Sequence, residues 1–380
     1  MVKSPLKKVA VGCQGGGMHA AFEVGVLIEI LKAYENQKFD LVGLSGTSAG
    51  ALCALMTWYG LAAKNGHAGS AGEAIERLTR FWDQFVAKTG AETLLNLMTF
   101  GALRLEETEI PVLGINAPIL GINPAGAIYK TVTACLPRIG VRTQYYDLQE
   151  LLGTDCADFP HIEWSKIKTR LLIGASEVVN GYETVFDSDV NRAGGSGKTR
   201  KWRQRLPLSL SGVAASGTLP TFREAQRIDG GYYWDGLYSQ NPPVREFLAD
   251  AGKDEKPDEL WIVRINPQQW PEEPRTNGDI IDRQNELMGN LSLHKELDFI
   301  LAVNKWSSSY KGFEPKHKHV TVRTIKMEKK TADELRYSSK FNRSREFMDQ
   351  LREEGRIVAR DWLDRWPHRV GEYPEDAAYR

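Results

Sequence analysis

Hydrophobic residues form two similar units within the first sixty positions of the chain. Each unit has a short apolar run, a turn of small residues and then a longer apolar segment with few charges. The first unit covers residues 8–33 and the second covers residues 41–56. Short apolar runs bounded by glycine are typical of buried strands, and long apolar segments with few charges are typical of largely buried helices. Two strand–turn–helix units in succession predict a parallel sheet with helices on its faces.

The same patterns recur later in the chain. Strands are predicted at residues 170–179, up to residue 186 after a turn at Asn180-Gly181, at 260–266 and at 319–325. Helices are predicted at residues 74–87, 279–305 and 342–366. Residues 187–205 are rich in Gly, Ser, Arg and Lys and are predicted to form a surface loop.

Residues 90–128 have a different pattern. They are rich in Leu, Ile, Met and Phe but lack a regular period, and Gly and Pro interrupt them. Such a segment is expected either to form a lid over an apolar cleft or to pack into the core. The sequence leaves both interpretations open.

The composition describes an ordinary globular protein, with 42% hydrophobic and 26% charged residues among 380. Lys plus Arg and Asp plus Glu both number 49, so no overall field attracts nucleic acid or an anionic membrane. No apolar stretch reaches the roughly 18 residues that a membrane span needs. The first apolar run is also too short for a signal peptide. We expect a cytoplasmic protein that contacts membrane or lipid surfaces at most peripherally.

The four cysteines, Cys13, Cys53, Cys135 and Cys156, lack metal-ligand spacing, and two of them lie in strongly apolar runs. This pattern favours buried reduced thiols over disulfides. The sequence predicts neither a metal site nor an organic cofactor.

The most informative motif lies at the turn of the second unit. Residues 46–50 read Gly-Thr-Ser-Ala-Gly, with a predicted strand before them and a predicted helix after them. This is the G-x-S-x-G pattern of a nucleophile elbow, in which a sharp turn exposes the serine hydroxyl. Glycine is needed two residues before and after the serine because the turn brings the two backbones together. Ser48 is therefore the candidate nucleophile.

A second glycine turn opens the helix of the first unit. Backbone N–H groups at Gly15, Gly16 and Gly17 are suited to hold an oxyanion, because their positions are fixed and the helix dipole adds positive character. The alternative is a loop that binds phosphate or a dinucleotide. The dinucleotide fingerprint would need glycine at position 20, which is alanine.

Residues 194–199 suggest a phosphate-binding Walker A loop, but that motif would need glycine at position 192, which is arginine. No strand leads directly into this stretch and no helix clearly follows it. A flexible loop is the preferred interpretation.

A nucleophilic serine also needs a base. None of the seven histidines lies in a strand-end loop that would mark a Ser-His-Asp triad, and His317 and His319 are interpreted as the solvated approach to a strand. Residues 228–243 contain Asp-Gly pairs at Asp229 and Asp235, among aromatic residues. Burial there would raise the pKa of a carboxyl group and make it a better base. The alternative is a hairpin turn, and for one of the two aspartates it must hold.

Together these motifs resemble those of the patatin-like phospholipases, a family of lipid acyl hydrolases with a Ser-Asp dyad. The match consists of the triple glycine after the first strand, residues 46–50 after the second, and an Asp-Gly pair followed by Asn241-Pro242, in the family's order. Residues 214–220 are similar to the family's small-residue stretch ahead of the aspartate. The resemblance covers roughly residues 8–265.

The resemblance favours Asp235 as the base, because Asn241 follows it by six residues as in the family. Asp229 has the better literal match, D-G-G, and is then a hairpin residue. The chain departs from the family pattern at two places: the loop G-G-G-x-R-G ends here in His19 and Ala20, and the aspartate motif reads D-G-L. Neither departure removes a catalytic group.

The resemblance implies an α/β fold, with a three-layer α/β/α patatin-like domain and a mainly parallel sheet over residues 1–270. A helical C-terminal extension over residues 271–380 would pack on this domain. In one interpretation residues 90–128 form its lid.

The implied activity is hydrolysis of a carboxylic ester in phospholipid or a similar lipid, through an acyl-Ser48 intermediate. Asp235 would take the serine proton directly, and the N–H groups of Gly16 and Gly17, with Gly15 as a third candidate, would hold the oxyanion. Two alternatives stay open: an acyltransferase or polyester depolymerase with the same dyad, and a catalytically silent lipid-binding protein. The expected partner is a lipid ester and not nucleic acid, and the oligomeric state is not predicted.

Overall fold

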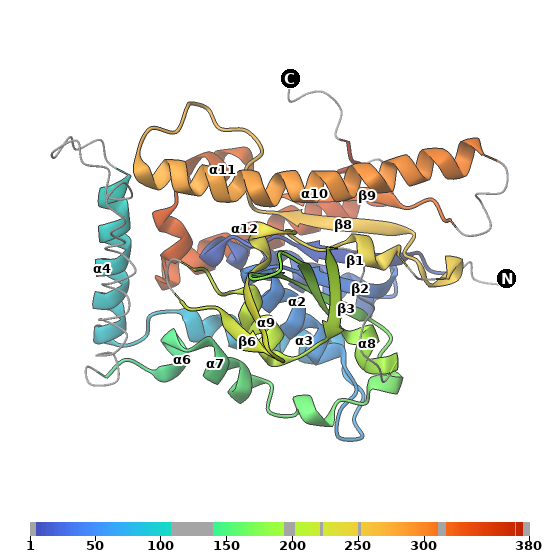
Figure 1. Cartoon of the computed structure of the whole chain (residues 1–380), viewed down its shortest axis with the longest axis horizontal. Helices are drawn as coiled ribbons and strands as arrows, with labels where there is room; N and C mark the ends of the chain where they lie inside the picture. Colours follow the sequence, from blue (N-terminus) through green and yellow to red (C-terminus); the bar gives the residue numbers. More distant parts are fainter. Residues whose placement is uncertain are drawn as a thin grey trace.

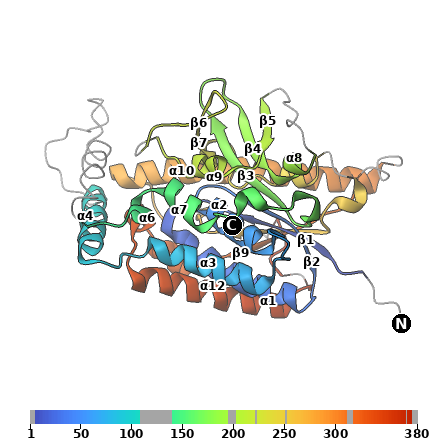
Figure 2. The same cartoon turned by 90° about the horizontal axis from the view of Figure 1, so that it is seen from below.

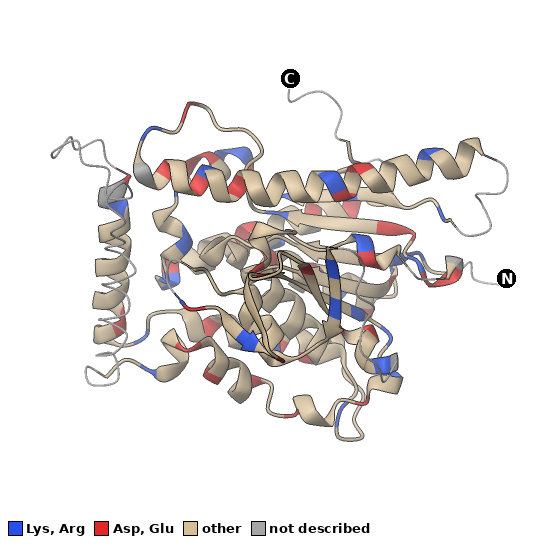
Figure 3. Cartoon of the chain, viewed as in Figure 1, with Lys and Arg blue, Asp and Glu red and all other residues tan. Residues whose placement is uncertain are grey.

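The computed structural model describes residues 5–107, 140–193, 202–220, 223–249, 252–310, 317–368 and 370–374. Within them, a nine-stranded sheet runs through the middle of the molecule, with helices on both faces (Figures 1 and 2). Basic and acidic residues are interspersed over the surface elements (Figure 3). The sheet with helices on both faces confirms the predicted α/β class.

The strands are β1 (Lys8–Cys13), β2 (Asp40–Gly46), β3 (Arg170–Glu177), β4 (Glu183–Asp187), β5 (Arg203–Pro207), β6 (Gln226–Ile228), β7 (Gly231–Asp235), β8 (Glu259–Arg264) and β9 (Thr321–Lys326). Their order is β5-β4-β3-β2-β1-β8-β9, and β7 pairs with both β3 and β6. All these pairs are parallel except β3–β4, β3–β7 and β6–β7. The sheet is thus mainly parallel, as predicted.

The longer helices are α1 (Ala21–Glu35), α2 (Ala49–Leu61), α3 (Ala71–Phe85), α4 (Gly90–Glu106), α7 (Leu148–Asp155), α9 (Leu210–Ser216), α10 (Asn277–Ser309) and α12 (Arg345–Arg365). Shorter helical segments include η1 (Gly17–Ala20), α6 (Thr143–Tyr146), α8 (Ser188–Ala193), η6 (Gly236–Tyr238), α11 (Lys329–Glu334) and η9 (Ser338–Phe341).

Two hydrophobic cores lie on opposite faces of the sheet, because successive side chains of a strand point to opposite sides. Val9, Val11 and Cys13 of β1 belong to the core that contains α1, α2, α3 and α12. Ala10 belongs to the other core, where Leu293 of α10 packs. This alternation produces the three layers of the domain.

One predicted loop was wrong in part. The stretch 187–205 contains the helix α8 and the strand β5, which pairs in parallel with β4. Arg205 of β5 forms an ion pair with the buried carboxylate of Asp187. Basic residues in this stretch therefore do not all mark a solvated loop, because one of them pairs with an acidic residue at the edge of the sheet. The segment 90–128 begins with α4, and its part beyond residue 107 lies outside the described residues.

The C-terminal segment joins the sheet as well as covering it. β9 pairs in parallel with β8, while α10 covers one face and α12 packs on α1 at the other (Figures 1 and 2). The division into a domain of residues 1–270 and an extension of residues 271–380 stays a prediction.

Cys13, Cys53 and Cys156 are free and buried, as expected, and Cys135 lies outside the described residues. Among the helices that the structure describes, none is long and apolar enough to cross a membrane.

The contact between α1 and α12 depends on two glycines that face each other's helix. A Cβ atom at Gly25 would lie 2.0 Å from the carbonyl oxygen of Arg352, and one at Gly355 would lie 2.0 Å from that of Phe22. Real Cβ atoms do not approach backbone so closely, so the two helices touch only because both positions lack a side chain.

Replacing Gly355 with alanine should therefore force α12 away from α1 and lower the free energy of unfolding by about 1–3 kcal/mol. Urea denaturation of the purified variant measures this change. Gly153→Ala is the matched control, because a Cβ on Gly153 of α7 meets nothing within 4 Å. The control should be neutral or more stable by up to about 1 kcal/mol, since alanine favours helix. Equal stability of the two variants would contradict the packing argument.

Candidate active site

Ser48 lies at the sharp turn between β2 and α2. Its backbone has φ 55° and ψ −126°, a conformation that non-glycine residues rarely adopt. A Cβ atom at Gly46 would lie 2.2 Å from the carbonyl oxygen of Gly50, and one at Gly50 would lie 2.4 Å from that of Cys13. The glycines of the motif are thus needed for the close approach of strand, helix and β1.

Hydrogen bonds from neighbouring segments hold this turn. The Ser48 N–H donates to Oγ of Ser216 at 2.9 Å, and Oγ1 of Thr47 donates to the carbonyl oxygen of Gln240 at 2.8 Å. Ser216 is fully buried at the end of α9. Sequence reasoning did not identify Ser216, although it singled out the small-residue stretch that contains it.

The strand β3 brings Asp235 next to the serine turn. β2 ends at Gly46, which pairs with Ile173 of β3, and Asp235 at the end of β7 pairs with Ala175. Because β4 occupies the opposite edge of β3, β2 and β7 share one edge. Along this edge of β3, Asp235 therefore lies next to the end of β2, where the chain turns at Ser48.

Asp235 is a fully buried carboxylic acid. Its Oδ1 accepts the N–H of Leu237 at 2.8 Å, and its own N–H donates to the carbonyl oxygen of Thr218 at 2.9 Å. In the described part of the chain, Oδ2 has no hydrogen bond of standard geometry, yet the Ser48 hydroxyl is close enough to influence the carboxyl. Burial raises the pKa of Asp235 to about 7, against smaller lowering effects of the Leu237 N–H and the Ser48 hydroxyl.

The triple glycine lies against the serine turn: a Cβ at Gly15 would be 2.6 Å from Cβ of Ser48. The N–H of Gly15 donates to Oδ1 of Asn241 at 2.6 Å and is therefore occupied. In the described part of the chain, the N–H groups of Gly16 and Gly17 have no such partner. Gly17 has φ 59°, which favours glycine. The loop therefore offers two N–H groups, whereas the sequence suggested up to three.

A cavity of about 90 Å³ connects these groups. The glycine loop, Ser48 and Asp235 form one part of its wall. The remaining lining residues are Leu219, Leu237, Asn266, Asp282, Asn285, Glu286, Tyr337, Lys340 and Phe341. Three of them lie on α10 and three lie on or next to η9, so the C-terminal segment completes the cavity.

The C-terminal part of the wall carries paired charges. Nζ of Lys340 bonds to the carboxylate of Asp282 and lies 3.4 Å from Oε1 of Glu286. The two carboxylates raise the pKa of the Lys340 ammonium despite its burial. Sequence reasoning missed this cluster; acidic residues four apart in a mostly polar helix are common and gave no specific signal.

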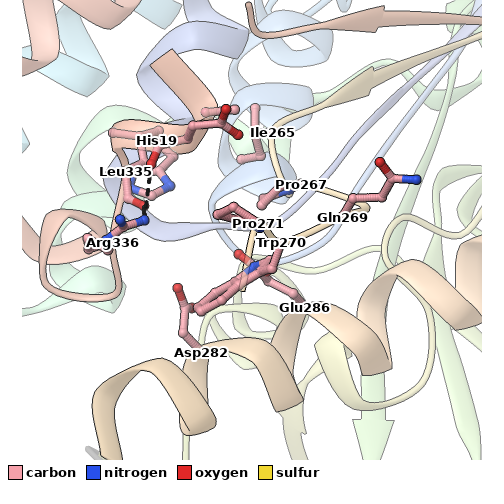
Figure 4. A pocket seen from close by; sticks show the side chains of 12 residues that line it. His19, Ile265, Pro267, Gln269, Trp270, Pro271, Asp282, Glu286, Leu335 and Arg336 are labelled. Carbon is pink, nitrogen blue, oxygen red and sulfur yellow. Dashed lines mark hydrogen bonds between the residues drawn. The ribbon is translucent and has the colours of Figure 1, made fainter. Parts of the chain in front are cut away.

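His19 lies on a different, smaller cavity of about 20 Å³ (Figure 4). This cavity shares Asp282 and Glu286 with the one at Ser48, and Trp270 also lines it. Nε2 of His19 is 2.7 Å from Oγ of Ser339, and burial lowers the pKa of His19 well below its usual value, with a smaller contribution from Lys340. The wall of the Ser48 cavity contains no histidine among the described residues.

The other candidates from the sequence lie elsewhere. Asp229 is exposed at the turn between β6 and β7, with φ 48°. The glycine loop at 194–199 is outside the described residues. α4, the described start of the predicted lid, is tied to the segment after η9 by the N–H of Arg343, which donates to Oδ1 of Asn96 at 2.8 Å. The lid interpretation stays a prediction.

A mainly parallel α/β sheet with a serine on a strained strand-to-helix turn defines a fold of the nucleophile-elbow class. The sequence model of the family described as Patatin-like phospholipase matches residues 13–248, which is more than half of the chain. The chain belongs to the patatin-like phospholipase family.

Two solved structures are similar to the chain at low sequence identity. VipD from Legionella pneumophila is 13% identical with a TM-score of 0.40, over 95% of this chain and 67% of that one. The type III effector ExoU is 13% identical with a TM-score of 0.32, over 95% of this chain and 54% of that one. The chain thus spans about two thirds and about half of these proteins. No curated protein sequence matches it.

The burial of Asp235 predicts a pH-dependent effect on stability. The folded chain holds the Asp235 proton more tightly than the unfolded chain, in which the pKa of aspartate is about 4. Wild-type stability from this group is therefore complete below about pH 4 and is lost as the pH rises to about 7. Asp235→Asn should consequently raise the free energy of unfolding at pH 8, on the order of 2–4 kcal/mol.

Urea denaturation of both proteins at pH 8, 6 and 4.5 measures this difference, which should shrink steadily as the pH falls. Asp229→Asn, at an exposed turn, is the control and should change little at any pH. A stabilisation by Asp235→Asn that does not vary with pH would mean that the carboxyl is not held protonated by burial.

Proposed function

We propose that this protein hydrolyses carboxylic esters of phospholipid or a similar lipid through an acyl-Ser48 intermediate. The observation that carries the proposal is the single cavity on which Ser48, Asp235 and the glycine loop meet. Membership of the patatin-like phospholipase family supports the lipid substrate.

The reaction follows from the groups on the cavity wall. Oγ of Ser48 attacks the acyl carbonyl carbon while Asp235 takes the hydroxyl proton. The N–H groups of Gly16 and Gly17 bind the oxyanion that forms. Asp235 then returns the proton to the leaving alcohol oxygen as the ester C–O bond breaks. A water molecule then gives a proton to Asp235 as it attacks the acyl-serine. Asp235 passes this proton to Oγ of Ser48 as the acyl C–Oγ bond breaks, which releases the carboxylic acid and restores the serine hydroxyl.

A buried aspartate suits this role better than an exposed one. An ordinary aspartate has a pKa near 4 and is a weak base toward a hydroxyl group. Burial raises the pKa of Asp235 to about 7, so near neutral pH its carboxylate binds a proton more strongly than an ordinary aspartate does and is still present in its ionised form.

The dyad gives a direct prediction for activity on one soluble ester, such as a p-nitrophenyl acyl ester. Ser48→Ala and Asp235→Asn should both lose nearly all turnover, at least about 10³-fold. Asp229→Asn should stay within a few-fold of wild type, because Asp229 is exposed at a hairpin turn. Labelling by a fluorophosphonate should require Ser48 in the same way.

Wild-type turnover by Ser48→Ala would refute the proposal, and activity lost in Asp229→Asn but kept in Asp235→Asn would reverse the assignment of the base. A wild-type protein that neither turns over ester nor reacts with the fluorophosphonate would be a lipid-binding protein. Product analysis in the presence of an alcohol separates a hydrolase from an acyltransferase.

The raised pKa of Asp235 also predicts the pH dependence of the rate. Only the ionised carboxylate accepts the serine proton, so kcat/KM should rise with pH and level off above about pH 7. Below that pH it should fall about tenfold per unit. A pH profile of kcat/KM on the same ester measures this; a profile that is already flat from pH 5 upward would show that the base has an ordinary aspartate pKa.

A further inference from the structure

The peptide group that joins Gly15 to Gly16 is held by side-chain amides from distant parts of the chain. Its carbonyl oxygen accepts Nδ2 of Asn266 at 2.8 Å and, less closely, Nδ2 of Asn241 at 3.4 Å. Asn241 also accepts the preceding N–H, that of Gly15, at 2.6 Å. Asn241 is fully buried and Asn266 nearly so. Both sides of Gly15 are therefore anchored.

Anchoring this carbonyl fixes the direction of the Gly16 N–H. A trans peptide group is planar, and its C=O and N–H point in opposite directions. The carbonyl of Gly15 points toward the buried amides of Asn241 and Asn266. The N–H of Gly16, in the same peptide plane, must then point away from them, and Gly16 lines the cavity that contains Ser48.

We propose that Asn241 and Asn266 are positioning residues, which orient the Gly16 N–H toward the oxyanion by holding the Gly15 carbonyl. This inference rests on the proposed function and assigns to Asn241 and Asn266 a role in it that neither motif nor fold implies. Glycine has no side chain to restrain its own backbone, so a loop of three glycines needs outside partners to be preorganised. The bonds to the carbonyl also polarise the peptide and strengthen its N–H as a donor.

A second pair of amides holds Asn266 in turn. Oε1 of Gln14 accepts the N–H groups of Ile265 at 3.1 Å and Asn266 at 3.2 Å. Nε2 of Gln14 donates to Oδ1 of Asn290 at 3.1 Å, and Nδ2 of Asn290 donates to the carbonyl oxygen of Pro267 at 3.1 Å. Asn266 and Asn290 lie beyond the family-matched residues 13–248, so the segment after β8 belongs to the support of the oxyanion loop.

Asn304 provides a matched control on the same helix as Asn290. Its side chain bonds to the backbone of one residue, Val320, in the way that Asn241 bonds to Gly15. Nδ2 donates to the carbonyl oxygen of Val320 at 2.8 Å, and Oδ1 accepts the Val320 N–H at 3.0 Å. Asn304 is as buried as Asn266, but it is not on the wall of the Ser48 cavity. Its loss should affect stability without affecting the oxyanion loop.

The test compares Asn241→Ala, Asn266→Ala and Asn304→Ala on the soluble ester. The first two should lower kcat about 10- to 100-fold, somewhat less than the loss of a whole oxyanion donor, and leave KM within about threefold. Asn304→Ala should keep kcat within about twofold.

Folded Asn241→Ala and Asn266→Ala variants with wild-type kcat would overturn the proposal, as would an equal loss of kcat in Asn304→Ala. A loss in Asn266→Ala alone would overturn it too, because Asn266 would then be acting directly on the substrate.

Hydrogen–deuterium exchange of the peptide that contains residues 14–17 gives a readout that needs no substrate. Exchange should quicken in Asn241→Ala and Asn266→Ala and stay unchanged in Asn304→Ala; unchanged exchange in the first two would refute the network even in an active enzyme. If wild type itself hydrolyses no ester, the proposed function fails, and this measurement still decides whether the amides hold the loop. If Asn241→Ala does not fold, Asn266→Ala alone tests the proposal. A loss of kcat with faster exchange of residues 14–17 supports the proposal, and a loss of kcat with unchanged exchange overturns the proposal.

Discussion

The close approach of three backbones around Ser48 is the constraint on which the rest of the structure depends. Gly46, Gly50 and Gly15 each lie where a Cβ atom would come within 2.2–2.6 Å of a neighbouring atom. This contact holds Ser48 at φ 55°, a conformation that a free chain would seldom adopt. The strain is sustained because β1, β2 and α2 are all buried in one core, so the turn cannot relax without separating them.

The sheet then converts this local constraint into a relation between distant residues. β1 carries the glycine loop and β2 carries Ser48, and the two strands are parallel neighbours. β3 pairs with β2 and then with β7, which places Asp235 beyond the end of β2. The glycine loop and Ser48 meet because the parallel strands β1 and β2 bring their carboxyl ends to the same edge of the sheet. Asp235 joins them because β7 runs antiparallel to β3 and ends next to the end of β2.

Much of this arrangement could be predicted from the sequence, because its signals are local. The runs at residues 8–14 and 41–46 read as strands, and the glycines around Ser48 mark a turn that only glycine permits. The position of Asn241 favoured Asp235 over Asp229, and the structure places Asp235 on the cavity and Asp229 at an exposed turn. The assignment of catalytic roles to these residues stays a prediction.

What the sequence could not predict depends on long-range contacts. β5 forms in a Gly- and Arg-rich stretch because it pairs with β4 and because Asp187 forms an ion pair with its Arg205, and neither contact is visible in the local sequence. The amides that hold Gly15 come from Asn241 and Asn266, which have no periodicity that connects them to the glycine loop. Asn266 had one weak signal: it is the polar residue at the end of the predicted strand 260–266, where ligand-contacting residues often lie.

The neutral amides near the glycine loop have a consequence for Asp235, the proposed base. A cation bonded to Asp235 would favour its ionised form, lower its pKa and weaken it as a proton acceptor. Lys340 lies on the same cavity, but its ammonium is bonded to the carboxylates of Asp282 and Glu286. Burial is therefore the main cause of the raised pKa of Asp235, while the side chains bonded to the glycine loop are uncharged amides. Charged partners thus lie away from the Asp235 carboxyl and neutral amides lie at the glycine loop, an arrangement that leaves the pKa of Asp235 raised.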